Sequence, residues 1–371
     1  MKSIYFKTAL ALAATLNLGD SAWAAKILSN KVNISVRSTP VGAQDFAARC
    51  AAPGVVKCVG FDQASDIAGT FGENSGIFSG SNNAPQLDTA VRASGNSSLR
   101  FTVTTSSASS GGSYFTNFSS DLQTQFDSGQ TFYVQWRQRF DTQYATMNLG
   151  SFGNGGWKQV IVGSGDKPGC TKSNSLTIDS GGFCTSSCTP LETVVQNTYH
   201  RGFPVMYNSC SGSSSTQNGK YAGGTGPYVP FEEPFNGFDF KLQNAMPAPY
   251  CLYSQGATNS YFPPKGNCFG YAANEWMTFK MRIVIGTRTN DYFKGSHVDL
   301  WVSRQGQAPA HVFNWNWDLA AGPAAQNLKF GKIWLLTYNS NNAGNNNAPV
   351  PTAQTWYDDL IISTQDIADP K

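Results

Sequence analysis

Short runs in which apolar and polar residues alternate make up the patterned part of this 371-residue chain. A period of two is typical of β-strands, because successive side chains of a strand point to opposite faces of a sheet. Clusters of Gly, Asn, Ser and Pro separate the runs, as expected for turns. No segment of convincing length has a helical period, and no internal repeat occurs. The predicted strands are Ser98–Thr105, Thr131–Phe140, Trp157–Gly163, Leu191–Arg201, Glu275–Ile285, His297–Ser303, Lys332–Tyr338 and Thr355–Ser363.

These strands predict an all-β protein, a two-sheet antiparallel β-sandwich around one core, without a second domain. We divide the chain into an N-terminal leader (1–24), an N-terminal segment (25–60) and the sandwich domain (61–369). Two stretches, 164–190 and 208–273, are too long and too polar for strands. Loops of this length often carry function as lids or binding walls. The alternative is surface decoration held in place by disulfides.

Composition narrows the class of protein. Only 13% of the residues are charged, which excludes a coiled coil, a long helical bundle and charge-driven disorder. The formal net charge of +3 does not indicate a nucleic-acid binder, which would concentrate Lys and Arg on one face. A polyanionic ligand would therefore depend on a few local cationic side chains.

The first 24 residues have the pattern of a secretory signal. Lys2 and Lys7 supply the positive end, residues 8–16 a short apolar stretch, and 22–24 (Ala-Trp-Ala) a small-x-small cleavage pattern. No later segment approaches the ~20 apolar residues that a membrane span needs. We expect a secreted or periplasmic protein with no membrane association.

An even number of cysteines, eight, indicates disulfide bonds in such an oxidising compartment. Proximity along the chain favours Cys50 with Cys58 and Cys251 with Cys268. The remaining four, expected to pair among themselves, are Cys170, Cys184, Cys188 and Cys210. A zinc site at 184–188 is the competing interpretation, and it is weak because no histidine stands at a ligand spacing.

The predicted strand 131–140 carries the first group of candidate binding residues. One face holds Phe132, Val134, Trp136 and Phe140, and the other holds Tyr133, Gln135, Arg137 and Arg139. The planar Arg fork binds carboxylates with two hydrogen bonds, and Tyr offers both a ring and a hydroxyl. The row therefore predicts a groove for sugars that carry carboxylates. The alternative is a ladder of ion pairs on an exposed sheet face.

A second concentration lies in residues 194–201. Alternation separates Asn197, Tyr199 and Arg201 from Gln196, Thr198 and His200, and it does not say which set faces a ligand. His200 can act as a base near neutral pH, although a lone histidine is more often structural. Further candidates are Lys158, Gln159 and Tyr338, the last at the end of a strand. We expect His297 on a strand and His311 in an inert loop.

Six segments resemble one known group of proteins: 133–140, 156–162, 194–203, 275–282, 332–338 and 355–363. In these segments the chain is similar to secreted bacterial polysaccharide lyases with the concanavalin A-like jelly-roll fold, including heparin-lyase-like, glucuronan-lyase-like and alginate-lyase-like families. The resemblance covers roughly residues 61–369. The same fold also hosts hydrolases and lectins.

The resemblance implies β-elimination on an acidic, uronate-containing polysaccharide. The candidates it implies for neutralising the uronate carboxylate are Gln159, Gln196, Asn197, Arg137 and Arg139. It implies Tyr199 or His200 as base and Tyr338 as acid. Tyr133, Gln135, Lys158 and Arg201 are expected to bind substrate. Lys332 departs from the heparin-lyase spacing, because it stands six residues before Tyr338.

Other functions on this fold have distinct requirements. A retaining hydrolase needs two carboxylates on one cleft face, and no strand carries the necessary Glu-x-Asp-x-x-Glu run. The remaining alternatives are a non-catalytic carbohydrate-binding module and a structural envelope protein. We expect a monomer that requires no cofactor. Asp358 and Asp359 are candidate ligands of a structural Ca²⁺, and a solvated strand end is the alternative.

Overall fold

The structure, a computed structural model, describes only part of the chain. The described residues are 40–68, 75–78, 83–107, 109–121, 123–146, 157–165, 191–197, 202–208, 232–235, 238–241, 251–252, 265–266, 268–290, 292–321, 324, 327–338 and 349–371. The chain divides into two compact units, and the second, Val41–Lys371, contains both sheets described below. Within the described residues, no helix is long and apolar enough to cross a membrane.

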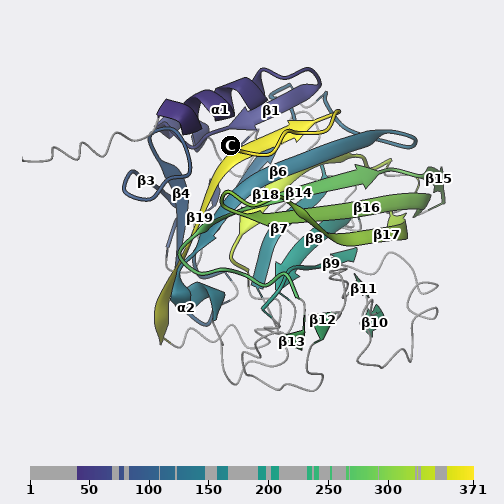
Figure 1. The fold of residues 1–371 in the computed structure, drawn as a ribbon. Coiled ribbons are helices and arrows are strands. Elements are labelled where there is room, and N and C mark those ends of the chain that lie inside the picture. Colours follow the sequence, from purple (N-terminus) through teal and green to yellow (C-terminus); the bar gives the residue numbers. More distant parts are fainter. Residues whose placement is uncertain are drawn as a thin grey trace, which may run out of the picture. The chain divides into compact units, whose positions relative to one another are not determined.

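Nine described strands form an antiparallel sheet, here called sheet A, with the order β15-β16-β14-β6-β19-β4-β3. In addition, β1 pairs with β19 and β17 pairs with β16. Figure 1 shows β6, β14, β16 and β17 side by side. The strands are β1 (Val55–Val59), β3 (Gln86–Asp88), β4 (Ser98–Thr105), β6 (Thr131–Phe140), β14 (Trp276–Val284), β15 (Thr287–Thr289), β16 (Tyr292–Arg304), β17 (Ala310–Ala320) and β19 (Pro349–Ser363).

Eight described strands form the second antiparallel sheet, sheet B, with the order β10-β11-β9-β8-β7-β18-β5-β2. Its strands are β2 (Ser75–Phe78), β5 (Ser113–Asn117), β7 (Trp157–Ser164), β8 (Glu192–Asn197), β9 (Val205–Asn208), β10 (Glu232–Phe235), β11 (Phe238–Lys241) and β18 (Phe330–Leu336). A separate pair joins β12 (Cys251–Leu252) to β13 (Lys265–Gly266). The helical elements are α1 (Pro40–Cys50), η2 (Ala64–Asp66) and α2 (Thr142–Ala145).

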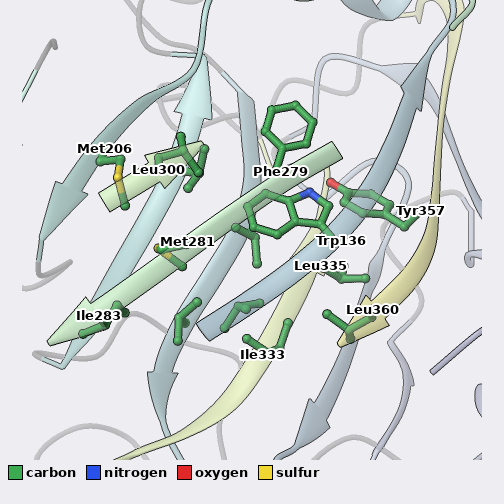
Figure 2. Close-up of a cluster of buried hydrophobic side chains, with 14 of the residues drawn as sticks. Trp136, Met206, Phe279, Met281, Ile283, Leu300, Ile333, Leu335, Tyr357 and Leu360 are labelled. Carbon is green, nitrogen blue, oxygen red and sulfur yellow. The ribbon is translucent and has the colours of Figure 1, made fainter. Parts of the chain in front are cut away.

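The two sheets enclose one apolar core (Figure 2). Trp136 of β6 stacks on Phe279 of β14 with ring centroids 5.2 Å apart, and Ile333 of β18 belongs to the same buried cluster. Burial of one such side chain stabilises the fold by roughly 1.5–3 kcal/mol. The inward set of β6 is the apolar set that the alternation predicts. The prediction of a two-sheet antiparallel β-sandwich is confirmed.

The N-terminal part departs from the expectation that the chain lacks helices. Residues 40–50 form α1, whose sequence contains few apolar side chains, and β1 joins sheet A by pairing with β19. The predicted Cys50–Cys58 disulfide is confirmed and ties the end of α1 to β1. Long-range contacts hold this helix, so a local periodicity test does not detect it.

The other cysteine predictions are only partly tested. Cys268 is disulfide-bonded. Its predicted pairing with Cys251, and the pairing of Cys170, Cys184, Cys188 and Cys210, lie outside the described side chains, as does the N-terminal leader.

Candidate functional site

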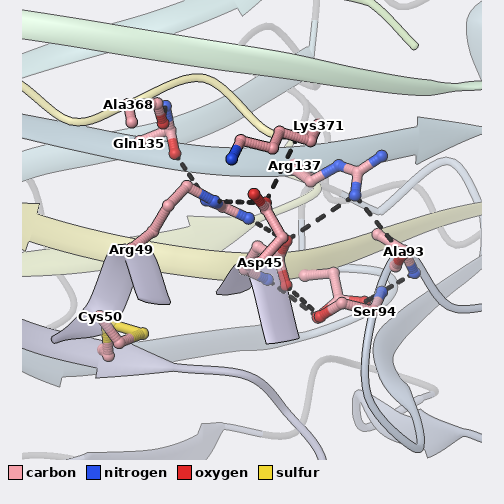
Figure 3. Close-up of polar contacts among 12 residues, drawn as sticks. Asp45, Arg49, Cys50, Ala93, Ser94, Gln135, Arg137, Ala368 and Lys371 are labelled. Atoms are coloured by element: carbon pink, nitrogen blue, oxygen red, sulfur yellow. Dashed lines mark hydrogen bonds and ion pairs between the residues drawn. A yellow bond between two sulfur atoms is a disulfide. The ribbon is translucent and has the colours of Figure 1, made fainter. Parts of the chain in front are cut away.

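The outward row of β6 lies on the face of sheet A that is turned away from the core. Gln135 and Arg137 are nevertheless buried there (Figure 3). Gln135 contacts α1 and the C-terminal segment, and Arg137 contacts Ala93 and Asp359. Arg49 Nη1 of α1 donates a hydrogen bond to Gln135 Oε1 at 2.8 Å, and Gln135 Nε2 donates to Ala368 O at 3.1 Å. The predicted glycan-binding use of Gln135 is therefore corrected: its amide holds α1 and the C-terminal segment on the sheet.

Arg137 belongs to the same ionic cluster. Its Nη1 lies 3.7 Å from Asp359 Oδ2, the oxygen that Arg49 Nη2 contacts at 2.7 Å. Burial lowers the pKa of Arg137, and the Asp359 and Asp358 carboxylates oppose that effect. An arginine that shares a buried counter-ion with Arg49 serves packing of the sheet face rather than capture of a ligand. This is a correction to the predicted catalytic use of Arg137.

The Asp358–Asp359 pair does not fit a calcium site. Two guanidinium groups already occupy the surroundings of Asp359, and the Asp358 carboxylate accepts backbone N–H groups of Ala93 and Ser94. Burial, and secondarily Asp359, raises the pKa of Asp358. Calcium requires six to eight oxygen ligands. The described residues contain no group of three or more His, Cys, Asp or Glu that could hold a metal ion.

The rest of the outer face of sheet A is a network of paired polar groups. Tyr133 hydrogen-bonds to Arg282, and Arg139 lies with its guanidinium carbon 6.0 Å from the centre of the Trp356 ring. The structure places both side chains on the opposite sheet from Tyr338.

His311 lies on β17, so its predicted position in a loop is wrong. Its Nε2 contacts Asp299 Oδ1 at 2.8 Å, and His297 Nε2, on a strand as predicted, contacts the same oxygen at 3.2 Å. The alternation of Phe313, Trp315 and Trp317 is the sequence signal that could have identified this strand.

Two residues of sheet B that were predicted to bind substrate contact other protein groups instead. Gln159 is fully buried between the sheets, where its Nε2 donates to Gln138 Oε1 at 2.9 Å. Asn197 Oδ1 accepts the N–H of Gly202 at 2.9 Å, which ties the end of β8 to the residues just before β9. The structure thus corrects the predicted direct substrate contacts of both residues.

The face of sheet B turned away from the core collects the remaining described candidates. Its apolar members, Ile161, Val194, Tyr207 and Leu336, form a cluster separate from the main core. Lys158 of β7 stands opposite Gln196 of β8 in the register, so the two side chains share this face. Lys158 is only 7% exposed.

Aromatic rings surround the Lys158 ammonium. Nζ lies 4.9 Å from the centre of the Tyr338 ring and 5.3 Å from the centre of the Tyr207 ring. The Tyr207 hydroxyl donates to Glu192 Oε1 at 3.1 Å. A backbone hydrogen bond holds Lys158 beside Tyr338, because the Lys158 N–H donates to Tyr338 O at 2.9 Å. Cation–π contacts of this kind attract an ammonium without neutralising it.

The electrostatics of this face distinguish its members. Burial lowers the pKa of Lys158, and the Glu192 carboxylate offsets part of that effect. Burial raises the pKa of Tyr207 and of Tyr338, so both phenols are protonated at neutral pH. Tyr338 is 39% exposed. We call Lys158, Glu192, Gln196, Tyr207 and Tyr338 the sheet B site.

The structure brings together three predicted residues, Lys158, Gln196 and Tyr338, in the sheet B site. Tyr199, His200 and Arg201 lie outside the described residues and stay predictions. Sequence reasoning missed Tyr207 and Glu192 as partners of Lys158. Val205 and Tyr207 share one parity on a strand of four residues, too short to stand out as an alternating run.

Comparisons with known proteins give only distant matches. No family model matches the sequence, and no curated protein matches it. Among solved structures, an endo-β-1,4-glucuronan lyase from the fungus Trichoderma reesei is 10% identical, with a TM-score of 0.44, over 85% of this chain and 99% of that one. A marine alginate lyase from Aplysia kurodai is 13% identical, with a TM-score of 0.47, over 84% and 99%.

A third similar structure has a different role. The binding domain of botulinum neurotoxin serotype D/C is 8% identical, with a TM-score of 0.36, over 85% of this chain and 50% of that one. Identities and TM-scores at these levels are too low to support an inference about activity.

Proposed function

We propose that this protein cleaves an acidic, uronate-containing polysaccharide by β-elimination at the sheet B site. One observation carries the proposal: a buried ammonium, Lys158 of β7, lies beside a partly exposed phenol, Tyr338, two residues past the end of β18. A uronate carboxylate would supply the negative charge that the rings around Lys158 do not. An exported protein, as the N-terminal leader predicts, would meet such polymers outside the cytoplasm.

The chemistry follows from where charge develops. When a base removes the proton on the carbon α to the carboxylate, negative charge moves onto the carboxylate oxygens. A cation already in place there stabilises the transition state without reorganisation. In the proposed reaction Lys158 carries that role. The base is one of the predicted pair, Tyr199 or His200.

Tyr338 completes the proposed reaction as the general acid. The electron pair left by the departing proton forms the carbon–carbon double bond, the bond from the β carbon to the glycosidic oxygen breaks, and Tyr338 gives its proton to that oxygen. The base later returns its proton through solvent, which restores the Tyr338 phenol. The raised pKa of Tyr338 keeps it protonated and ready for this step.

Absorbance of the unsaturated uronate product tests the proposal. We expect it to rise with at least one of alginate, glucuronan, pectate and heparin, and we expect Tyr338→Phe to lower kcat by about 10²–10⁴-fold. Tyr114→Phe is the matched control, because it also removes one tyrosine hydroxyl, from strand β5 in the core. No rise with any of these polymers, together with retention on a polysaccharide column, would favour a non-catalytic binding module instead.

A further inference from the structure

A buried polar network lies inside the sandwich, on the core side of the strands that carry Lys158 and Tyr338. The Gln159 amide donates to Gln138 Oε1 at 2.9 Å and accepts from the Tyr271 hydroxyl at 2.6 Å. Gln138 Nε2 donates onward to Thr355 Oγ1 at 3.0 Å. These groups come from both sheets, and satisfied buried networks hold the elements that they join in one arrangement.

Tyr357 extends this network to the backbone of sheet B. It belongs to β19 of sheet A, and its ring lies among apolar core side chains (Figure 2). Its hydroxyl lies 2.8 Å from Gln159 O on β7 and 3.2 Å from Leu336 O on β18. The Tyr357 hydroxyl thus contacts both β7 and β18. The Lys158–Tyr338 backbone hydrogen bond joins β7 to the residues that follow β18.

The position on β7 is a β-bulge. The register of β7 against β8 shifts between Lys158 and Val160, so Gln159 is an inserted residue. Lys158 points to the outer face, whereas Gln159 and Val160 both face the core. Bulges turn a side chain in a new direction and interrupt the ladder of hydrogen bonds. The Tyr357 hydroxyl supplies a donor where the ladder is interrupted.

We propose that Tyr357 is a positioning residue that sets the direction of Lys158 relative to Tyr338 by clamping the bulge at Gln159 to the end of β18. The proposal rests on the proposed function for its catalytic consequence. Without the hydroxyl, two carbonyl oxygens lose their shared donor and the bulge can relax. A misplacement of about 1 Å far from the chemistry can cost about 10²-fold in rate.

The test is the variant Tyr357→Phe, which removes one oxygen atom from the core. We expect kcat on the cleaved polymer to fall about 10–100-fold with little change in KM. We also expect the alkaline limb of the kcat/KM profile to move to higher pH, because a displaced Lys158 is less desolvated and its pKa returns toward that of an ordinary lysine. A purely structural role would not move that limb.

Tyr114→Phe is again the matched control. Tyr114 is a fully buried tyrosine whose hydroxyl donates to a backbone carbonyl, Asp66 O, at 3.1 Å. It does not contact β7 or β18 through that hydroxyl. We expect a comparable decrease in Tm for the two variants and an unchanged kcat and alkaline limb for Tyr114→Phe. Equal kinetic effects of the two substitutions would overturn the positioning role.

Amide hydrogen exchange separates this proposal from the proposed function, because it needs no substrate. The Lys158 N–H should exchange as slowly as core amides in the wild type and distinctly faster in Tyr357→Phe. If no polymer is cleaved but exchange changes in this way, the contact of Tyr357 with the bulge is supported and the proposed lyase activity is wrong. If the Lys158 amide exchanges rapidly in the wild type, or its exchange is unaffected by Tyr357→Phe, the positioning role of Tyr357 is wrong.

Discussion

The two outer faces of the sandwich both bury charged side chains, and they treat those charges differently. On sheet A, Arg49 and Arg137 share Asp359, and Arg282 contacts Asp299 with two nitrogens. On sheet B, the Lys158 ammonium lies against two aromatic rings, and the Glu192 carboxylate also attracts it. A buried charge with its own counter-ion serves the fold, whereas one held against rings can take its counter-ion from a ligand.

The largest effect expected from this comparison concerns Asp359. Asp359→Asn leaves two buried guanidinium groups without their anion, and we expect it to lower the free energy of unfolding by about 3–5 kcal/mol. Urea unfolding measures the loss, and the activity of the folded fraction should not change. The control is Asp366→Asn, since Asp366 is 66% exposed and pairs with Lys280 at 3.0 Å. Because solvent screens the exposed Asp366 carboxylate, this pair contributes less than about 1 kcal/mol. Equal losses in the two variants would contradict the distinction between the pairs.

Lys158→Met should lower activity and leave stability intact, the opposite of Asp359→Asn. Methionine keeps a similar volume on a face that already holds Tyr207 and Leu336, so the free energy of unfolding should stay constant or rise. Activity should fall by at least about 10²-fold, because the transition state loses its cation. Lys280→Met is the matched substitution on sheet A. It should reduce stability, since Lys280 Nζ bonds Ile367 O at 3.0 Å, and leave the specific activity intact.

Removal of the Cys50–Cys58 disulfide should affect the sheet A side of the sandwich alone. Replacing Cys50 and Cys58 by serine opens a short loop between residues eight positions apart and should cost about 2–3 kcal/mol. The effect should loosen α1 above Gln135 without altering the sheet B site. Thermal unfolding and initial rates of the double variant test both statements. Loss of activity in a folded double variant would show that the two faces are coupled.

The smallest effect is a dependence of stability on pH. Because burial depresses the pKa of Lys158 below its ordinary 10.5, the unfolded chain binds more protons than the folded one between the two values. The free energy of unfolding should therefore rise with pH through that window. The difference between wild type and Lys158→Met isolates the contribution. A difference that stays flat with pH would mean that the pKa of Lys158 is not lowered.

Alternation along the sequence was sufficient to predict the core but not the function of the outer faces. Phe132, Val134 and Trp136 lie inward as predicted, because period-two alternation reports directly on burial. The same pattern assigned Gln135 and Arg137 to a ligand groove. Their partners are Arg49, 86 residues before Gln135, and Asp359, far along the chain, so no local pattern can reveal the pairing.

The sheet B site was only partly predictable for a related reason. Lys158, Gln196 and Tyr338 stand out by residue type, and their proximity follows from strand order. Gln159 is inserted at the β-bulge, so Val160 faces the core as Gln159 does, which simple alternation from Trp157 cannot anticipate. Tyr207 and Glu192 join the site through a contact across β8 and β9 that depends on the register of the two strands.

The most direct test of the account compares initial rates of double-bond formation in wild type, Lys158→Met and Lys280→Met on the same acidic polymer. Both variants remove one buried ammonium, and the two ammonium groups lie on opposite sheets. We expect product from the wild type and from Lys280→Met, and about one hundredth of that rate or less from Lys158→Met. Full activity of Lys158→Met with loss in folded Lys280→Met would place the chemistry on sheet A and contradict it.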